Sequence, residues 1–331
     1  MSDPFVALLM LGLFIVFIFF GFPIAFTMMA MGMGFGFYAY FTPDQLIWDN
    51  RILYLFTQNT FSVMNNDVLI SIPLFLFMGY IIERANILDR LFLSLQVGLR
   101  GVPGSMAVAA LVTCTLFATA TGIVGAVVAL MGLIALPAML KAGYDEKLAA
   151  GVITAGGTLG ILIPPSVPLV IYAILTEQNI AKMFLAAFVP GILAAVGYMV
   201  VIGIVARVSP KDAPAGTKFS FAQRLKALSE TWPVILIFIT VIGGIYGGIF
   251  TPTEAASIGT LATGLVAWTS GGLKGRGFLE CMYGAAGATG MIFLILLGAD
   301  VMNVFLALTQ VHTELANWVI GLGLPPLAVL M

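Results

Sequence analysis

Charged residues are scarce in this sequence. Asp, Glu, Lys and Arg make up 9% of the 331 residues, whereas 61% are hydrophobic. Soluble domains carry about 25% charged residues, so this composition excludes an ordinary water-soluble protein. The mean hydropathy is +1.10, and the apolar segments are continuous rather than alternating, which excludes a transmembrane β-barrel. The sequence therefore predicts an all-α polytopic membrane protein embedded in a lipid bilayer.

Cysteine and histidine are nearly absent. The two cysteines, Cys114 and Cys281, both lie in apolar segments, which argues against a disulfide framework or a metal cluster. His312 is the one histidine, and a single histidine does not make a zinc site. The net charge of -1 gives no indication of a nucleic-acid partner. The N-terminus lacks the basic leader of a signal peptide, so we expect it to be retained.

Enzyme motifs are missing as well. The sequence has no H-E-x-x-H motif, no G-x-S-x-G serine elbow and no paired intramembrane aspartates. It has no Walker motif either, so we expect no ATP hydrolysis by this chain. The sequence thus predicts a protein that is not an enzyme. Composition alone does not exclude a channel protein.

Long apolar segments predict the membrane spans. They cover 5–20, 22–41, 67–82, 106–140, 148–180, 183–206, 231–250, 253–270 and 278–299. A straight crossing needs roughly 20 residues, so 106–140 and 148–180 are too long for one simple span each.

Positive charges give the predicted orientation. With a periplasmic N-terminus and 106–140 as a re-entrant hairpin, all of the 14 Lys and Arg residues except Arg51 and Lys182 lie on the cytoplasmic side. A full crossing by 106–140 would place Lys141 and Lys147 outside and invert every later loop. The charges therefore favour a hairpin whose Thr-Gly-rich tip stops partway through the membrane.

Two parts of the sequence are weakly similar in the same order. RGVPGSMAVAAL, from Arg100, parallels GLPPLAVLM, from Gly323, and Gly79 stands opposite Gly298 in the preceding segments. The predicted orientation makes these repeats inverted, which is typical of secondary transporters. We predict a first repeat at 1–206, a cytoplasmic linker at 207–230 and a second repeat at 231–331 that ends in the opening arm of a second hairpin. Within the first repeat we expect scaffold helices, a cytoplasmic arm helix at 83–105, the hairpin at 106–140 and an interrupted helix at 148–180.

Helix-breaking residues cluster in the middle of 148–180. They are Gly156, Gly157, Gly160, Pro164, Pro165 and Pro168. Adjacent prolines remove two backbone donors and disfavour helix before them. We therefore expect two half-helices joined by an unwound link, the alternative being a simple proline kink. Free backbone groups at membrane depth are tolerated only where they are buried or line a cavity.

The hairpin tip and this break together predict a binding site. Helix N-termini favour anions, while free carbonyls and threonine hydroxyls suit a sodium ion, and neither break contains a carboxylate. The predicted sodium residues are Thr121, Gly122, Gly157 and Thr158, and the predicted substrate residues are Thr119, Pro164, Pro165 and Ser166. The alternative for the threonines is bonding to their own helix or small-residue packing.

Three stretches of the sequence resemble the large membrane subunit of TRAP (tripartite ATP-independent periplasmic) transporters. They are FATATGIVGAVVALMGLIALPAMLKAGYD, GGTLGILIPPSVPLVIYAILTEQNIAKMFLAAFVPGIL and GIFTPTEAASIG. The resemblance implies an elevator-type permease of the bacterial inner membrane that imports organic acids with sodium. It also implies two partners, a small four-helix membrane subunit and a periplasmic substrate-binding protein. Large subunits of this family normally continue beyond the second hairpin's opening arm.

One departure concerns the hairpin tip. Many family members carry a Ser-Gly-Ser-Ser tip, whereas this sequence has Thr121-Gly122-Ile123-Val124, so backbone carbonyls would replace two hydroxyls as sodium ligands. The nearest rival is a stand-alone sodium–dicarboxylate symporter of the same superfamily, working without a binding protein. The substrate class stays open among dicarboxylates, 2-oxo acids and related carboxylates.

A few further charged residues allow two readings each. Glu83, Arg84, Asp89 and Arg90 fit a solvated interfacial helix, which in an elevator carrier would be the arm. We expect Glu254 to interact with the N-terminus of its own helix, and Asp300 to be hydrated just past the end of a span. Intramembrane carboxylates are functional candidates by default.

Overall fold

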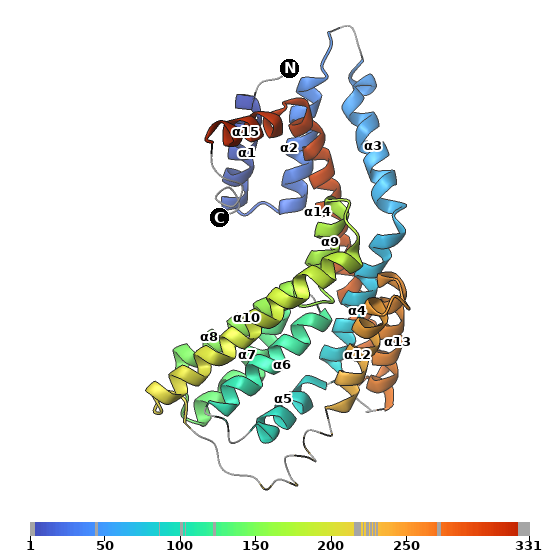
Figure 1. The fold of residues 1–331 in the computed structure, drawn as a ribbon. Helices are drawn as coiled ribbons and strands as arrows, with labels where there is room; N and C mark the ends of the chain where they lie inside the picture. Colours follow the sequence, from blue (N-terminus) through green and yellow to red (C-terminus); the bar gives the residue numbers. More distant parts are fainter. Residues whose placement is uncertain are drawn as a thin grey trace. The chain divides into compact units, whose positions relative to one another are not determined.

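A computed structural model gives the structure of the chain. The described residues are 4–43, 46–85, 87–99, 102, 104–121, 124–214, 220, 222, 225, 227, 229, 231–269 and 273–323, without the side chains of 89, 120 and 121. The helices are α1 (Pro4–Phe19), α2 (Ile24–Ala39), α3 (Arg51–Met64), α4 (Ser71–Arg84), α5 (Ile87–Gly98), α6 (Ser105–Thr121), α7 (Val124–Lys141), α8 (Glu146–Leu162), α9 (Val167–Leu175), α10 (Ile180–Val208), α12 (Trp232–Tyr246), α13 (Pro252–Thr269), α14 (Gly275–Leu308) and α15 (Val311–Gly321) (Figure 1). Short 3-10 turns at Ile47–Asp49 and Asp67–Ile70 precede α3 and α4.

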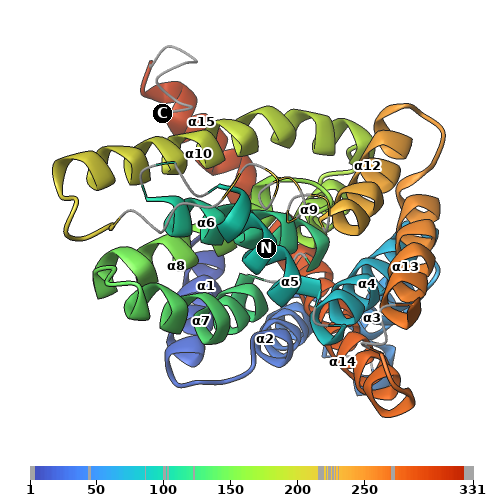
Figure 2. The same cartoon turned by 90° about the horizontal axis from the view of Figure 1, so that it is seen from below.

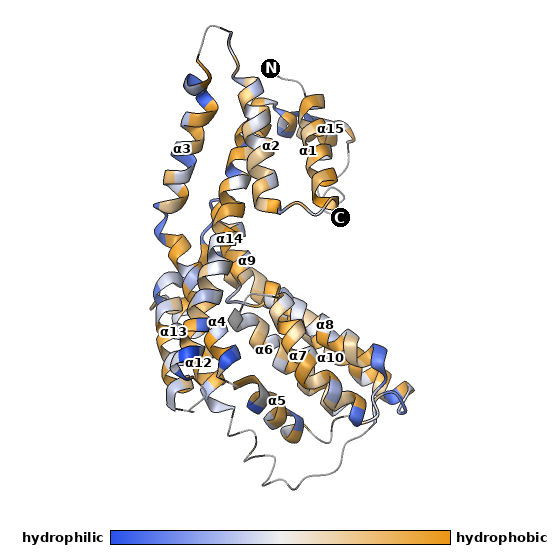
Figure 3. Cartoon of the chain, turned by 180° about the vertical axis from the view of Figure 1, so that it is seen from behind, coloured by the Kyte–Doolittle hydropathy of each residue, from blue (hydrophilic) through white to orange (hydrophobic). Residues whose placement is uncertain are grey.

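The all-α polytopic architecture is confirmed. Val124–Lys141, Glu146–Leu175, Ile180–Val208 and Gly275–Leu308 are long and apolar enough to cross a membrane, and Arg51–Met64 with Asp67–Arg84 would add a fifth span if counted as one. Coloured by hydropathy, α7 and α10 are predominantly apolar along their length (Figure 3). An apolar side chain exposed on such a helix, like Leu133 at 77%, fits a lipid-facing surface.

Most predicted segments match the helices to within a few residues, but α14 continues to Leu308, nine residues past the predicted end at 299, and three further differences occur. The arm helix predicted at 83–105 is wrong in its bounds, because α4 continues to Arg84 and the separate helix α5 ends at Gly98. Glycine and proline follow Gly98 in the sequence and end the helix there. Helices α3 and α15 were not predicted, since polar residues interrupt their apolar pattern.

The helices form two compact units. One comprises 1–67 and 287–331 and the other 68–286, so the division falls inside α14. In the first unit α2 crosses α14 closely: a Cβ atom on Gly32 would lie 2.7 Å from the backbone N of Met302, and one on Gly298 would lie 2.9 Å from the carbonyl O of Ala25. These units do not coincide with the predicted repeats, and the inverted relation of the repeats stays a prediction.

Glycines set the packing of the second unit, in which α8 lies against both α6 and α7 (Figure 2). A Cβ atom on Gly160 would lie 2.5 Å from the Cβ and the carbonyl O of Ala118 in α6. A Cβ atom on Gly157 would lie 2.5 Å from Cγ2 of Val128 in α7. Only residues without a side chain allow this approach, so Gly157 and Gly160 are small-residue packing positions between the helices.

Helix α4 packs against α13 and also touches α6. The Thr260 hydroxyl in α13 donates to the Leu74 carbonyl in α4 at 2.9 Å, and a Cβ atom on Gly259 would lie 2.8 Å from the Met78 sulfur. A group of α4, α12 and α13 therefore stands beside the α6 arm of the hairpin, and this group completes the walls of the candidate site.

Candidate functional site

The hairpin tip lies between α6 and α7. Helix α6 ends at Thr121 and α7 begins at Val124, and the two helices pack against each other. This confirms a helical hairpin with its turn where the sequence predicted it. Gly122 and the Thr121 side chain lie outside the described residues, so their part in a sodium site stays a prediction. The same holds for re-entry into the membrane, and α7 by itself has the length of a span.

The predicted break in 148–180 is confirmed. Helix α8 ends at Leu162, α9 begins at Val167, and Pro164, Pro165 and Ser166 between them are buried. In a continuous helix the carbonyl of Ile161 would accept a bond from the N–H of residue 165, which proline lacks. The Ser166 hydroxyl donates to that carbonyl instead, at 2.9 Å. Ser166 thus satisfies one of the backbone groups that the prolines leave free.

A small cavity brings the hairpin and the break together. Its volume is about 30 Å³. The lining residues are Met78, Ile82, Ile87, Leu116, Thr119, Pro165, Val234, Ile237, Phe238 and Val266. Two of the predicted substrate residues, Thr119 from α6 and Pro165 from the break, therefore share one site. A single water needs about 10–15 Å³, so this cavity is large enough for a water or an ion but too small for an organic acid.

The hydroxyls of Thr119 and Ser166 are placed as acceptors. Thr119 is 1% exposed and donates to the Leu116 carbonyl at 2.8 Å, and Ser166 is fully buried and donates to Ile161. Each proton is thereby used, while the oxygen lone pairs remain available. Lone pairs suit a cation, whereas a carboxylate substrate needs donors. In this conformation each of the two hydroxyls is better suited to coordinate an ion than to bind an acid.

The other two described sodium candidates diverge. Gly157 is buried, and a Cβ atom there would lie 3.7 Å from the carbonyl O of Val124, the first residue after the tip. Thr158 is exposed, and its hydroxyl donates to the Ala155 carbonyl of its own helix at 2.7 Å. The structure thus places Gly157 beside the tip. The Thr158 hydroxyl bonds to its own helix, which is the alternative given above for the threonines.

Sequence reasoning missed the apolar walls of the cavity. Met78, Val234 and Val266 come from α4, α12 and α13, which are remote in sequence from the hairpin. They carry no motif, and only their helical periodicity could have marked them as core residues. Their effect on the site is to exclude water around the Thr119 hydroxyl.

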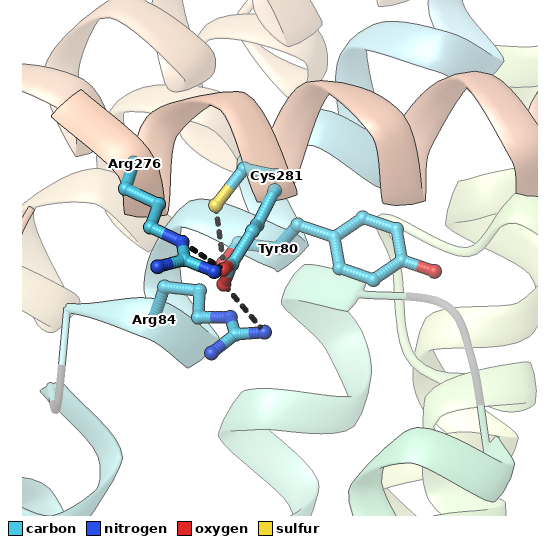
Figure 4. A network of polar contacts seen from close by, with 5 residues as sticks. Tyr80, Arg84, Arg276 and Cys281 are labelled. Carbon is cyan, nitrogen blue, oxygen red and sulfur yellow. Dashed lines mark hydrogen bonds and ion pairs between the residues drawn. The ribbon is translucent and has the colours of Figure 1, made fainter.

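Charged residues form a contact network at the end of α4 (Figure 4). Arg84 Nη2 lies 2.9 Å from Glu280 Oε2, Arg276 Nε lies 3.7 Å from Glu280 Oε1, and the Cys281 thiol donates to the Tyr80 carbonyl at 3.3 Å. Arg84 is therefore paired with α14 and is not simply a solvated residue of the arm. The network ties the end of α4 to α14.

Two further carboxylates were singled out in the sequence. Glu254 accepts from the backbone N–H and the hydroxyl of Thr251 at 2.8 and 2.9 Å, which is a capping box, so its predicted place at a helix N-terminus is confirmed. The prediction for Asp300 is wrong in its position, because α14 continues to Leu308 and Asp300 is half-buried within it.

Comparison with known proteins gives a consistent result. Residues 11–331 match the family described as "Tripartite ATP-independent periplasmic transporter, DctM component". The chain is 35% identical over 269 residues to the C4-dicarboxylate TRAP transporter large permease protein DctM of Pseudomonas aeruginosa, covering 80% of this chain and 62% of that protein. It is 29% identical over 271 residues to the sialic acid TRAP transporter large permease protein SiaM of Vibrio cholerae, covering 81% and 62%. It is 34% identical over 190 residues to the ectoine/5-hydroxyectoine TRAP transporter large permease protein UehC of Ruegeria pomeroyi, covering 57% and 44%. The chain thus spans less than two thirds of each of these relatives.

Proposed function

Because this chain belongs to the DctM component family of tripartite ATP-independent periplasmic transporters, we propose that it is the permease subunit of a sodium-coupled importer of small organic acids. Membership confirms the resemblance seen in the sequence. It also confirms that the chain is not an enzyme, since the family consists of transporter permeases. The proposal adds to this the coupling ion, the substrate class and the partners.

The observation that carries the proposal is the meeting of the hairpin and the interrupted helix at one buried cavity. Thr119 and Pro165 line it, and the Thr119 oxygen keeps lone pairs for an ion. Ser166, the residue after Pro165, also keeps lone pairs. A desolvated oxygen gains more from a cation than an exposed one, because the local dielectric is low. Together with the carbonyls of the tip around Thr121 and Gly122, these groups would hold sodium without any carboxylate.

An organic acid is the proposed substrate class. The relatives are named for C4-dicarboxylates, sialic acid and ectoine, and the first two are acids. The substrate does not fit the present cavity, so it would enter after the hairpin and the Pro164-Pro165 break move apart from the walls formed by α4, α12 and α13. Such a movement of one helix group past another is the elevator mechanism, and the inverted repeats would allow it to run in both directions.

The proposed complex has two further subunits. These are a small four-helix membrane protein and a periplasmic binding protein that delivers the acid, as the tripartite family description supports. The chain would lie in the bacterial inner membrane with its N-terminus in the periplasm. A stand-alone sodium–dicarboxylate symporter remains the second candidate, since it would need the same sodium site and hairpin.

Vesicles test the proposal. The full transporter, reconstituted with its small subunit and loaded with no internal sodium, is assayed for uptake of labelled organic acids with the binding protein and sodium each present or absent. We expect uptake only when the binding protein and sodium are both present outside the vesicles. Uptake without the binding protein would favour the stand-alone symporter. Uptake at the same rate with and without a sodium gradient would contradict sodium coupling.

A further inference from the structure

A second, larger hollow runs between α8 and α10, away from the candidate site. Its volume is about 230 Å³, and it is partly open to the surface. The lining residues are Leu111, Lys147, Leu148, Gly151, Val152, Ala155, Tyr198, Val201 and Ile202. Helices α8 and α10 pack against each other (Figure 1), and Leu111 of α6 also lines the hollow. Neither the sodium site nor the substrate proposal uses this groove.

The groove has a charged end and an apolar end. The backbone N–H of Asp145 donates to the carbonyl of Asp212 at 3.0 Å, which joins the start of α8 to the chain just after α10, so the two helices are antiparallel. Lys147 lies in the first turn of α8 at this end. Two turns further along α8, the walls are Ala155 and, on α10, Tyr198. Between the two ends every lining side chain is apolar or absent.

Lys147 is free to bind an anion. Its side chain is exposed, and it forms no ion pair with any residue that the structure describes. The adjacent carboxylate, Glu146, forms no ion pair with Lys147. The carboxylate of Asp145, two residues before Lys147, accepts from the N–H of Leu148 at 3.1 Å as the helix cap. Arg207, in the last turn of α10, adds a second positive charge at the same end of the helix pair.

We propose that this groove binds an anionic membrane phospholipid, with one acyl chain between α8 and α10 and the phosphate at Lys147. An apolar groove that is partly open to the surface matches an acyl chain, and an ammonium at its end matches a phosphate. The predicted orientation puts Lys147 on the cytoplasmic side, where the leaflet is anionic and basic pockets between transmembrane helices bind lipid head groups. The bound chain would fill the space that side chains leave between α8 and α10 and would hold the two helices together.

Native mass spectrometry of the purified chain in detergent tests the site. The chain is incubated with phosphatidylglycerol or with phosphatidylcholine of the same acyl chains, and bound lipids are counted. We expect one retained phosphatidylglycerol and weaker binding of phosphatidylcholine. Lys147→Gln should lower the affinity for phosphatidylglycerol about fivefold and leave phosphatidylcholine unchanged. Lys141→Gln, a matched exposed lysine that does not line the groove, should change neither.

Filling the groove gives an independent arm of the test. A Cβ atom on Gly151 would meet no atom within 4 Å, so Gly151→Phe should occupy the groove and remove the bound lipid. Gly197 in α10 is equally open but does not line the groove, and Gly197→Phe should keep the lipid. Val201→Trp, which fills the groove from α10, repeats the test if Gly151→Phe does not fold.

Three results would overturn the proposal. If Gly151→Phe and Gly197→Phe lost bound lipid equally, the lipid would be non-specific annular lipid rather than lipid in the groove. Lipid retained by both groove-filling variants would place it elsewhere. A lipid-free chain that is dimeric, and becomes monomeric on filling the groove, would assign the groove to a second copy of the chain.

Discussion

At the scale of single residues, Ser166 explains how the break between α8 and α9 is tolerated in a buried position. Pro165 removes the N–H that the Ile161 carbonyl would have accepted, and the Ser166 hydroxyl replaces it at 2.9 Å. The bond is partly buried, and a carbonyl left without a donor away from water costs about 1–3 kcal/mol. One hydroxyl therefore stabilises an unwound segment that the candidate site requires.

Removing this hydroxyl should destabilise the chain. We expect Ser166→Ala to lower the free energy of unfolding by about 1–2 kcal/mol, because the Ile161 carbonyl then has no donor. Ser257→Ala is the control: the Ser257 hydroxyl donates to the Thr253 carbonyl at 3.0 Å, but that carbonyl lies in a continuous helix and keeps its backbone donor. Thermal unfolding in detergent measures both, and equal losses would contradict the assignment.

Substitution of two buried threonines of α6 can distinguish a role in ion binding from a role in packing. Thr113 and Thr119 both donate to a carbonyl of their own helix at 2.8 Å, but only Thr119 lines the cavity. Thr119→Val keeps the shape and removes the lone pairs. Interactions with a charged group contribute about 1.5–3 kcal/mol, so in the full transporter the sodium concentration for half-maximal uptake should rise roughly tenfold or more. Thr113→Val should leave it unchanged, and similar effects from both variants would assign Thr119 to packing.

At the scale of elements, the fit of α8 against the hairpin depends on which glycines face it. Gly160 faces α6, where a Cβ atom would lie 2.5 Å from Ala118, while Gly151 of the same helix faces open space. The same substitution should therefore have opposite effects at the two positions. One position is limited by packing and the other only by helix propensity.

We expect Gly160→Ala to destabilise the chain by about 1–3 kcal/mol through overpacking. Gly151→Ala should stabilise it by about 0.5–1 kcal/mol, because alanine loses less conformational entropy in a helix. Melting temperatures of the two variants in detergent check the difference in sign. A gain in stability at Gly160 would mean that α8 does not approach α6 this closely.

The hairpin also carries the predicted orientation. If 106–140 enters and leaves on the cytoplasmic side, cysteines placed at Arg100 and at Lys141 should both react with a membrane-impermeant thiol reagent added from the cytoplasm. The native Cys114 and Cys281 are buried, so background labelling should be low. Labelling of the Lys141 position from the periplasm would show that the segment crosses the membrane.

At the scale of the whole molecule, the four tryptophans are all exposed, which is expected if they lie at membrane boundaries. Trp48, Trp232, Trp268 and Trp318 are 83%, 60%, 81% and 66% exposed. Trp232 begins α12 and Trp268 lies in the last turn of α13. The predicted orientation puts these two at the cytoplasmic boundary and puts Trp48 and Trp318 on the periplasmic side. Exposed tryptophan is typical of the interface between lipid and water.

Single-tryptophan variants in brominated lipids test this arrangement. Each tryptophan should be quenched more by lipids brominated near the head group than by lipids brominated at the chain ends, because the indole N–H seeks the interface. Val200→Trp in the middle of α10, where Val200 is 53% exposed, is the control and should show the reverse. If the four native tryptophans were also quenched more by lipids brominated at the chain ends, they would lie in the hydrocarbon core and the prediction would be wrong.

The sequence by itself determined the helices, the hairpin turn and the break at Pro164-Pro165. These follow from local rules, since apolar length sets a span and proline removes a backbone donor wherever it stands. Helices α3 and α15 were not predicted, because polar residues within them weaken that local pattern.

Only the tertiary structure decided which faces meet. It placed Thr119 with Pro165 in a cavity walled by Val234 and Val266, and it left Thr158 on an exposed face. It also made Gly160 a packing residue and Gly151 an open one, although the sequence around both reads alike. The physical reason is that helix formation depends on neighbours along the chain, whereas burial depends on helices that are distant in sequence.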